Sequence, residues 1–424
     1  MFKIFIIISG VTVSLFGANI YELFDAIGKN PSGIEEELKK QKIEISKNSL
    51  EANYYPKIEF FGSVEKYNTP MNITPLTPTE STSIMGGDKT LPFSKDLQKI
   101  GLNLQMSLFN PELDSLSEAL DKAVVATKEK VKMSMIQKES TIVNANANLA
   151  YLESLENFLR AKKSSLQQTK IKIDEGVSSG KIAQAEQLKL ENILNLIEIS
   201  LYEVTISKIK QMNFIEAVTK IKIDKSISIQ LQNKPIEGKV DESLKGLAYT
   251  IEATNTNIQA AQKSFYPKVF LQGTLLRGYG ESYYNNDTFY RDVASIGLKV
   301  VIPLYDKTKG SAIEEKKVEH LQAQNSYQKA LQELLAQENT LSKELAILEQ
   351  SIKLLENNVE NSQKLQRIAK VSYEEGRMNI EEYLRYEEEL LKAQSDLAKA
   401  RLKKWQNITS LALVYGIDLK EIVE

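Results

Sequence analysis

The 424-residue chain contains no cysteine and only one histidine, His320. The absence of cysteine excludes disulfides, thiolate metal sites, a cysteine nucleophile and a lipid-modified N-terminal cysteine. His320 follows the charged run at 314–317, which is the setting of a solvated surface residue. The sequence also has no GxxxxGK(S/T) loop to bind phosphates and no nucleophile beside a base. We therefore predict that the protein is not an enzyme and binds no cofactor or metal.

The sequence also lacks an excess of charge of either sign. It has 54 Lys and Arg against 56 Asp and Glu, for a net charge of −2. A nucleic-acid partner would need a basic face to neutralise phosphates, so we predict no nucleic-acid binding. Glycine and proline are scarce, with 19 and 10 residues, as is typical of long solvated helices.

Beyond residue 18 the sequence has no apolar run that approaches the roughly 20 residues of a transmembrane helix. Residues 1–18 have a basic Lys3 and a short apolar stretch, which predicts a secretory signal peptide. An uncleaved anchor is the alternative. The mature protein is thus expected to be exported, and it could enter a membrane only through β-strands.

Four segments alternate apolar and polar residues with the period of a β-strand, at 57–65, 100–108, 268–275 and 296–304. About nine alternating residues suit a tilted transmembrane strand, although a half-buried soluble sheet has the same period. The connections at 66–95 and 278–292 are rich in polar and turn residues and are predicted to be exposed loops. Aromatic residues that favour a membrane–water interface cluster where strands meet helices. They are Tyr54, Tyr55, Phe109, Tyr266 and Tyr305.

Four strands cannot close a barrel, which needs about eight. An open sheet in lipid would leave backbone groups without hydrogen bonds, at a cost of several kcal/mol each. If these strands lie in a membrane, the protein must be an oligomer that shares one barrel.

Two segments without glycine or proline, 112–172 and 311–375, predict helices of about 90 Å at about 1.5 Å per residue. Leucine and other apolar residues at steps of four and three between 327 and 359 indicate coiled-coil packing, although a solitary rod has the same pattern. Shorter helices are predicted at 182–222 and 380–413, so each long helix begins an antiparallel hairpin. Acidic residues and C-capping glycines mark the two hairpin tips. They are Asp174, Glu175, Gly176 and Gly180 in the first, and Glu374, Glu375 and Gly376 in the second.

The two halves of the sequence follow the same order of elements, about 200 residues apart. Tyr55-Pro56 and Tyr266-Pro267 open equivalent strands. The first predicted repeat, 19–240, has a helix at 20–52, a strand hairpin at 57–108 and a helical hairpin at 112–222. The second, 241–424, has a helix at 242–263, a strand hairpin at 268–304 and a helical hairpin at 307–413. The fold class is therefore α+β with an internal duplication.

Several motifs resemble the TolC family of outer membrane efflux and secretion channels over nearly the whole mature length. They are the two Tyr-Pro strand openings, the run Pro303-Leu304-Tyr305-Asp306 with Gly310, and Tyr373-Glu-Glu-Gly376 followed by Leu384, Glu389, Leu390, Ala393 and Ala398. The resemblance implies a homotrimer, with a shared 12-stranded β-barrel of four strands per chain. The barrel would continue into a long α-helical coiled-coil barrel that extends from the outer membrane of a Gram-negative bacterium into the periplasm.

The resemblance also implies passive exit of substrates from a tripartite efflux pump or a type I secretion system. The expected partners are outer membrane lipid, a periplasmic adaptor protein and, through it, an inner-membrane pump of the RND or ABC type. A periplasmic coiled-coil adaptor or scaffold is the alternative, although it would not need two hairpins of each kind.

In such channels the polar strand face lines the pore and the helical tips form the periplasmic aperture. The implied pore residues are Lys57, Glu59, Asn103, Gln105, Lys268, Gln272 and Lys299. At the second tip the implied aperture residues also include Tyr373, Glu382 and Arg385, and a ring of Glu382 could select cations. Alternatively, Glu382 and Arg385 simply pair on one helix, three residues apart.

Overall fold

The structure is a computed structural model that describes residues 19–72, 77–87, 92–232, 236–284 and 286–424. The predicted signal peptide at 1–18 lies outside these residues. The described chain forms two compact units. Unit 1 is drawn from Met1–Lys39, Lys128–Gly246 and Tyr327–Glu424, and unit 2 from Lys40–Thr127 and Leu247–Ser326. Each unit takes segments from both halves of the chain, and the division into repeats 19–240 and 241–424 stays a prediction.

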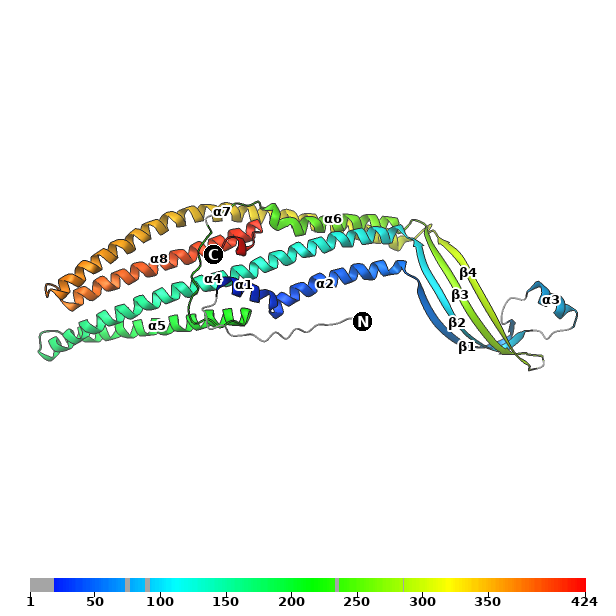
Figure 1. Cartoon of the computed structure of the whole chain (residues 1–424), viewed down its shortest axis with the longest axis horizontal. Helices are drawn as coiled ribbons and strands as arrows, with labels where there is room; N and C mark the ends of the chain where they lie inside the picture. The colour runs from blue at the N-terminus through cyan, green and yellow to red at the C-terminus, as the bar shows by residue number, and fades with distance from the viewer. Residues whose placement is uncertain (1–18, 73–76, 88–91, 233–235, 285) are drawn as a thin grey trace. The chain divides into compact units, whose positions relative to one another are not determined.

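Unit 2 contains one antiparallel sheet of four strands in the order β1-β2-β3-β4 (Figure 1). The strands are β1 (Lys57–Asn72), β2 (Phe93–Phe109), β3 (Lys268–Glu281) and β4 (Thr288–Val301). The central pair β2–β3 joins the two halves of the chain, with Gln105 opposite Gln272. The outer edges of β1 and β4 have no partner strand among the described residues.

The strands are longer than the alternating segments that predicted them, and the predicted loops at 66–95 and 278–292 are partly wrong. β1 continues to Asn72 and β4 begins at Thr288, while a short helix, α3 (Pro78–Met85), lies within the first connection. Backbone hydrogen bonds between neighbouring strands extend the sheet even where apolar and polar side chains no longer alternate. β4 ends at Val301, before the predicted end at residue 304, since Pro303 has no N–H for a ladder.

The predicted helical hairpins are present in both halves. They are α4 (Pro111–Ser178) with α5 (Gln184–Thr219), and α7 (Lys307–Glu374) with α8 (Ile380–Tyr415), lying side by side as antiparallel pairs (Figure 1). The long helices have 68 residues each, and α6 (Asp241–Lys263) precedes β3. In the described part of the chain, no helix combines the length and apolarity that crossing a membrane requires.

The predicted helix at 20–52 is two helices, α1 (Ile20–Lys29) and α2 (Pro31–Glu51), followed by the 3-10 turn η1 (Ala52–Tyr54). The break falls at Asn30, where Pro31 begins a new helix without needing an N–H donor. The Asn30 side chain donates to the carbonyl of Val218 and accepts from the N–H of Ser32, so the break is also fixed by hydrogen bonds.

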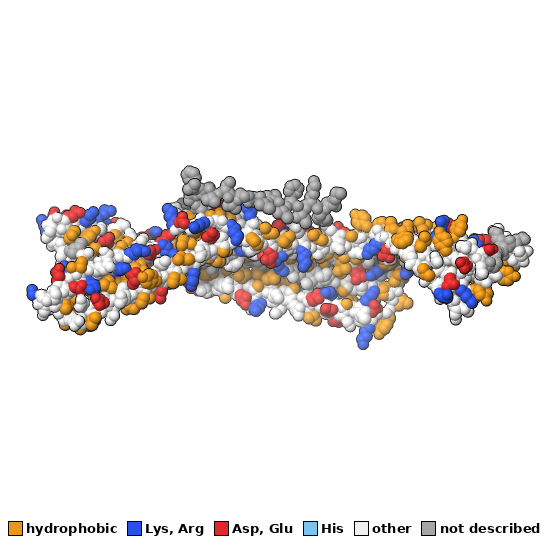
Figure 2. Space-filling view, turned by 90° about the horizontal axis from the view of Figure 1, so that it is seen from below, with side chains coloured by type: hydrophobic (Ala, Val, Ile, Leu, Met, Phe, Trp, Pro, Cys, Tyr) orange, Lys and Arg blue, Asp and Glu red, His pale blue; other side chains and the backbone are white. Residues whose placement is uncertain are grey.

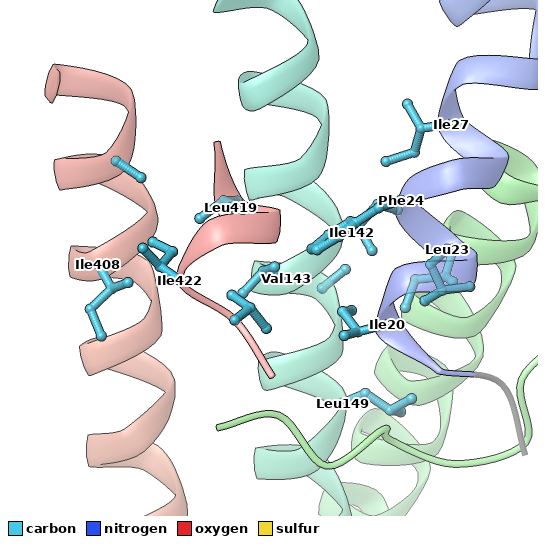
Figure 3. Packing of buried hydrophobic residues seen from close by; sticks show 14 of the residues in the cluster. Ile20, Leu23, Phe24, Ile27, Ile142, Val143, Leu149, Ile408, Leu419 and Ile422 are labelled. Atoms are coloured by element: carbon cyan, nitrogen blue, oxygen red, sulfur yellow. The ribbon is translucent and has the colours of Figure 1, made fainter. Parts of the chain in front are cut away.

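The main core of unit 1 lies where helices of both halves meet (Figure 3). Its buried side chains come from α1, α4, α5, α8 and the 3-10 turn η2 (Leu419–Glu421). They include Ile20, Leu23, Phe24 and Ile27 of α1, Ile142, Val143 and Leu149 of α4, Ile215 of α5, Ile408 of α8 and Leu419 of η2. A smaller cluster joins Ile352, Leu355 and Val359 of the predicted heptad pattern to Leu397 and Ala400 of α8. The coiled-coil packing predicted for this helix is therefore confirmed.

Candidate functional site

One face of the sheet is apolar and open to its surroundings. Strand pairing places Ile58 opposite Leu104, Leu102 opposite Leu275, and Gly273 opposite Ile296 on this face. Ile58 is 66 % exposed and Ile296 is 76 % exposed, which is unusual for large apolar side chains. Figure 2 shows hydrophobic side chains gathered over the strand region. An apolar face of this kind needs a nonpolar environment to cover it.

The opposite face of the sheet carries the polar side chains, including the seven residues predicted to line a pore. The register aligns Lys57 with Gln105 and Gln272, and Glu59 with Asn103, while alternation puts Lys268 and Lys299 on the same face. The Thr274 hydroxyl donates to the Asn103 side-chain oxygen across β2 and β3 at 3.1 Å. The structure thus gathers these residues on one side, and their contact with a pore stays a prediction.

Ion pairs on the polar face neutralise part of its charge, and the sequence did not reveal the partners. Lys268 pairs with Glu112 at the start of α4. The ammonium of Lys99 lies 2.6 Å from the carboxylate of Glu65, which also accepts from the Tyr67 hydroxyl. The sequence alone could not predict this ion pair. Lys99 comes near Glu65 because the strand register places Lys99 opposite Ser63.

Phe61 and Leu276 are two of the large apolar side chains that interrupt the polar face. Both lie opposite Gly101 on β2. A Cβ at Gly101 would come within 3.0 Å of the Phe61 ring and 2.3 Å of the Leu275 carbonyl oxygen. The ring therefore fills the space that the missing side chain leaves, which explains a large apolar residue on a polar face.

The five aromatic residues predicted at a membrane interface lie at the junctions of strands and helices. Tyr54 is held there, because its hydroxyl hydrogen-bonds the Asp114 carboxylate and the Asn110 carbonyl at the start of α4. The other rings point outward, with exposures of 70 % for Tyr55, 49 % for Phe109, 53 % for Tyr266 and 86 % for Tyr305. Their position at the junctions agrees with the prediction. Their contact with a membrane interface stays a prediction.

The first hairpin tip differs from the predicted one. Gly176 was expected to cap the long helix, but α4 continues to Ser178 and the left-handed residue is Gly180, with φ of +74°. Gly176 is needed for another reason: a Cβ there would lie 2.4 Å from the Cδ1 of Ile182. Ile182 thus packs against the last turn of α4 and closes the hairpin.

The second tip follows the prediction more closely. α7 ends at Glu374, and Gly376 has a φ of +71°, a conformation that other residues rarely adopt. The N–H of Arg377 bonds the carbonyl of Ser372 at 2.8 Å and so closes the last turn. Across the turn, the rings of Tyr373 and Tyr383 stack with centroids 5.4 Å apart.

The acidic residues of the tips have different surroundings. At the first tip, Asp174 accepts from Lys170 at 2.9 Å and from Gln187 at 2.9 Å, and the bond from Lys170 lowers the pKa of that carboxyl. The Glu175 side chain is exposed.

At the second tip, Glu374 and Glu375 are exposed, and Glu375 pairs with Arg377 at 3.2 Å. Glu382 and Arg385 are also exposed, and no ion pair joins them in the described part of the chain. The Asn379 side chain instead caps the backbone N–H of Glu382 at 2.9 Å. Glu382 is therefore a free carboxylate beside the tip rather than the partner of Arg385.

Two ion pairs join the helical hairpins to each other, and no pattern in the sequence predicted them. Lys172 of α4 lies 3.2 Å from Glu381 of α8, and Lys162 lies 3.5 Å from Glu388. The residue next to Glu382, rather than Glu382 itself, thus connects the tips. No local pattern could have shown this, because about 200 residues separate the partners of each pair.

Comparisons with known proteins agree with this architecture. Residues 240–416 match the family model described as outer membrane efflux protein. The CmeC outer membrane channel of Campylobacter jejuni is 15 % identical with a TM-score of 0.72, covering 94 % of this chain and 86 % of that one. The VceC outer membrane protein of Vibrio cholerae is 17 % identical with a TM-score of 0.70, covering 94 % and 96 %. The open MtrE channel of Neisseria gonorrhoeae is 16 % identical with a TM-score of 0.65, covering 94 % and 89 %. No curated protein matches the chain significantly in sequence.

The chain therefore has the fold of bacterial outer membrane channels, and residues 240–416 in its second half match the outer membrane efflux protein family. The resemblance to TolC-family channels indicated by the sequence motifs is confirmed. The matching family is one of channels rather than enzymes, and the adaptor alternative is not favoured.

Proposed function

We propose that the protein is one subunit of a passive exit duct in a bacterial outer membrane, serving a tripartite efflux pump or a type I secretion system. The observation that carries the proposal is the sheet in unit 2. It has one exposed apolar face, one polar face and two edges without partners in the described chain. Lipid against the apolar face and water against the polar face would satisfy both.

The free edges of β1 and β4 support a homotrimer. A barrel needs about eight strands to close, and three copies of this sheet supply twelve. In that arrangement β1 of one subunit pairs with β4 of the next, and no backbone group faces lipid without a hydrogen bond. Lys57, Glu59, Asn103, Gln105 and Gln272 would then line the pore.

The helical hairpins also offer surfaces for neighbouring subunits. On α5, Leu196, Ile199 and Ile206 are 62 %, 53 % and 52 % exposed, and their spacing of three and seven residues gives one stripe. Sister helices packed along such stripes form the wall of a tunnel in the periplasm. The hairpin tips would dock a periplasmic adaptor and, through it, an inner-membrane pump of the RND or ABC type.

The test is channel formation combined with two single lysine substitutions on opposite faces of β4. Leu298→Lys puts a charge on the apolar face, at a cost of about 2–4 kcal/mol in a bilayer, whereas Ser295→Lys puts it on the polar face of the same strand. We expect the native protein and Ser295→Lys to purify as trimers and conduct in planar bilayers, and Leu298→Lys to fail to insert. Equal insertion of both variants, or a native protein that stays monomeric without detergent, would contradict the proposal.

A further inference from the structure

The residues that follow α8, Ile417–Glu424, form a strap across the core of unit 1. Leu419, labelled in Figure 3, is fully buried in the main core, and so is Val423. The backbone pairs with a distant segment: the N–H of Glu424 bonds Gln230 and the N–H of Gln232 bonds Ile422, at 2.8 and 3.0 Å. The strap therefore joins α8 to helices and loops of the first half of the chain.

A carboxyl group is buried directly beneath this strap. Glu139 of α4 is only 4 % exposed, and its Oε2 atom has no hydrogen-bond partner. The groups that act on this carboxyl electrostatically all belong to the strap: the Asp418 carboxyl repels it, whereas the Lys420 ammonium and the backbone N–H of Leu419 attract it. An isolated buried carboxylate is costly, and two carboxylates side by side are more so.

The other charged groups around this pair come from the strap and α1. The Lys420 ammonium lies 2.7 Å from Asp25 of α1, and the backbone N–H of Lys420 bonds the Asp418 carboxylate at 3.0 Å. On the side of α8, the neighbouring Ser140 hydroxyl reaches the Thr409 carbonyl. Among the described residues, Lys420 is the cation that acts on Glu139, whereas Asp25 is also attracted to Lys29 of α1.

We propose that Glu139 is a protonation-controlled latch for the strap: the protonated, buried Glu139 carboxyl lets the strap stay on the core, and loss of its proton releases the strap. With Glu139 protonated, the negative charges of Asp418 and Asp25 lie near the positive charge of Lys420. Loss of the Glu139 proton adds a further negative charge in a buried site, where Oε2 has no donor among the described residues. Because Asp418 belongs to the strap, outward movement of the strap separates the two carboxylates and exposes Glu139 to water.

The direction of the effect follows from the pKa of Glu139. Burial, with repulsion from Asp418, raises this pKa from 4.5 to about 8. A carboxyl whose pKa is raised by folding stabilises the seated strap below about pH 4.5, and this contribution is lost as the pH rises to about 8. For one proton, the released fraction grows by up to about tenfold per pH unit across this window.

The absence of native cysteine allows a direct test on the full-length protein in detergent. Val423→Cys places a thiol at a fully buried strap position, and Glu421→Cys places one at an exposed position of the same strap. The rate of labelling with N-ethylmaleimide is measured at positions 423 and 421. The ratio of the first rate to the second reports strap release, because the rate at the exposed position corrects for the pH dependence of thiol reactivity. We expect this ratio to rise at least tenfold from pH 6 to pH 8.

Substitutions at the latch decide whether Glu139 is responsible. Glu139→Gln keeps the shape without the charge, so the ratio should be low and independent of pH. Glu129→Gln, a half-buried position on the same helix, should behave as the native chain does. If Glu139→Gln fails to fold, Asp418→Asn decides, because removal of the facing charge should lower the pKa of Glu139 and so reduce the rise between pH 6 and pH 8, while the contribution of burial remains. A ratio that does not rise with Glu139 present, or one that rises equally in these latch variants, would overturn the proposal.

Discussion

Reversing charges between the two helical hairpins should open the proposed channel. Lys172–Glu381 and Lys162–Glu388 connect α4 to α8 at 3.2 and 3.5 Å. An aperture that widens by moving one hairpin away from the other must break both pairs. Glu381→Lys with Glu388→Lys replaces attraction by repulsion at both positions while leaving the apolar packing of α7 on α8 unchanged.

The size of the effect follows from the exposure of these pairs. Their side chains are 22–47 % exposed, so each pair contributes roughly 0.5 kcal/mol. Two pairs in each of three subunits give about 3 kcal/mol, or roughly a 100-fold change in the ratio of closed to open channels. Repulsion after charge reversal adds to this, whereas high salt reduces it.

Single-channel recording in planar bilayers measures this change directly as the fraction of time in the high-conductance state. Glu360→Lys is the control, since Glu360 pairs only along its own helix with Lys364 at 2.6 Å. A charge swap, Lys172→Glu with Glu381→Lys, should restore the native closed fraction. If the double reversal conducts as the native channel does, or if the swap fails to restore closure, the two pairs do not hold the aperture.

Three further changes test separate parts of the structure. Glu382→Ala should raise single-channel conductance or weaken cation preference, and unchanged values of both would remove Glu382 from the aperture. Gly376→Ala places a side chain at φ of +71°, at a cost of about 1–2 kcal/mol, and should speed amide exchange at the second tip, with Gly376→Asn milder. Ile142→Ala empties part of the core at a fully buried position and should cost about 2–5 kcal/mol, seen as a lower melting temperature, whereas Met85→Ala at an 84 % exposed position should not.

The strands could be predicted only where side chains report on their environment. Between Ile100 and Leu108 every second residue is apolar, because one face of the sheet excludes water and the other does not. Beyond this zone the alternation fails, as at Lys66 and Tyr67, yet β1 continues to Asn72 and pairs with β2 again at Met71 and Asn72 after a shift of register. Sequence patterns therefore predicted the part of each strand next to a helix and missed the ends at the β1–β2 and β3–β4 connections, where backbone hydrogen bonds extend the pairing.

At the hairpin tips, side-chain packing limits what the sequence can predict. Gly176 and Gly180 carry the same local signal for a helix end, and the packing of Ile182 against Gly176 decides which one adopts a positive φ. The partner of Glu381 depends on how two hairpins from different halves of the chain pack together. Contacts of this kind need the tertiary structure, because no spacing along the chain encodes them.

These two kinds of information explain how this chain can share its fold with channels that differ from it at most positions. A strand needs an apolar residue at every second position, and a coiled-coil helix needs one about every 3.5 residues. Many different sequences meet these requirements and form the same strands and helical hairpins. A pair such as Glu139 with Asp418, or Lys172 with Glu381, needs particular residues at both positions. The fold is therefore set by patterns that tolerate substitution, whereas the proposed opening of the channel and the proposed response to pH depend on a few specific pairs.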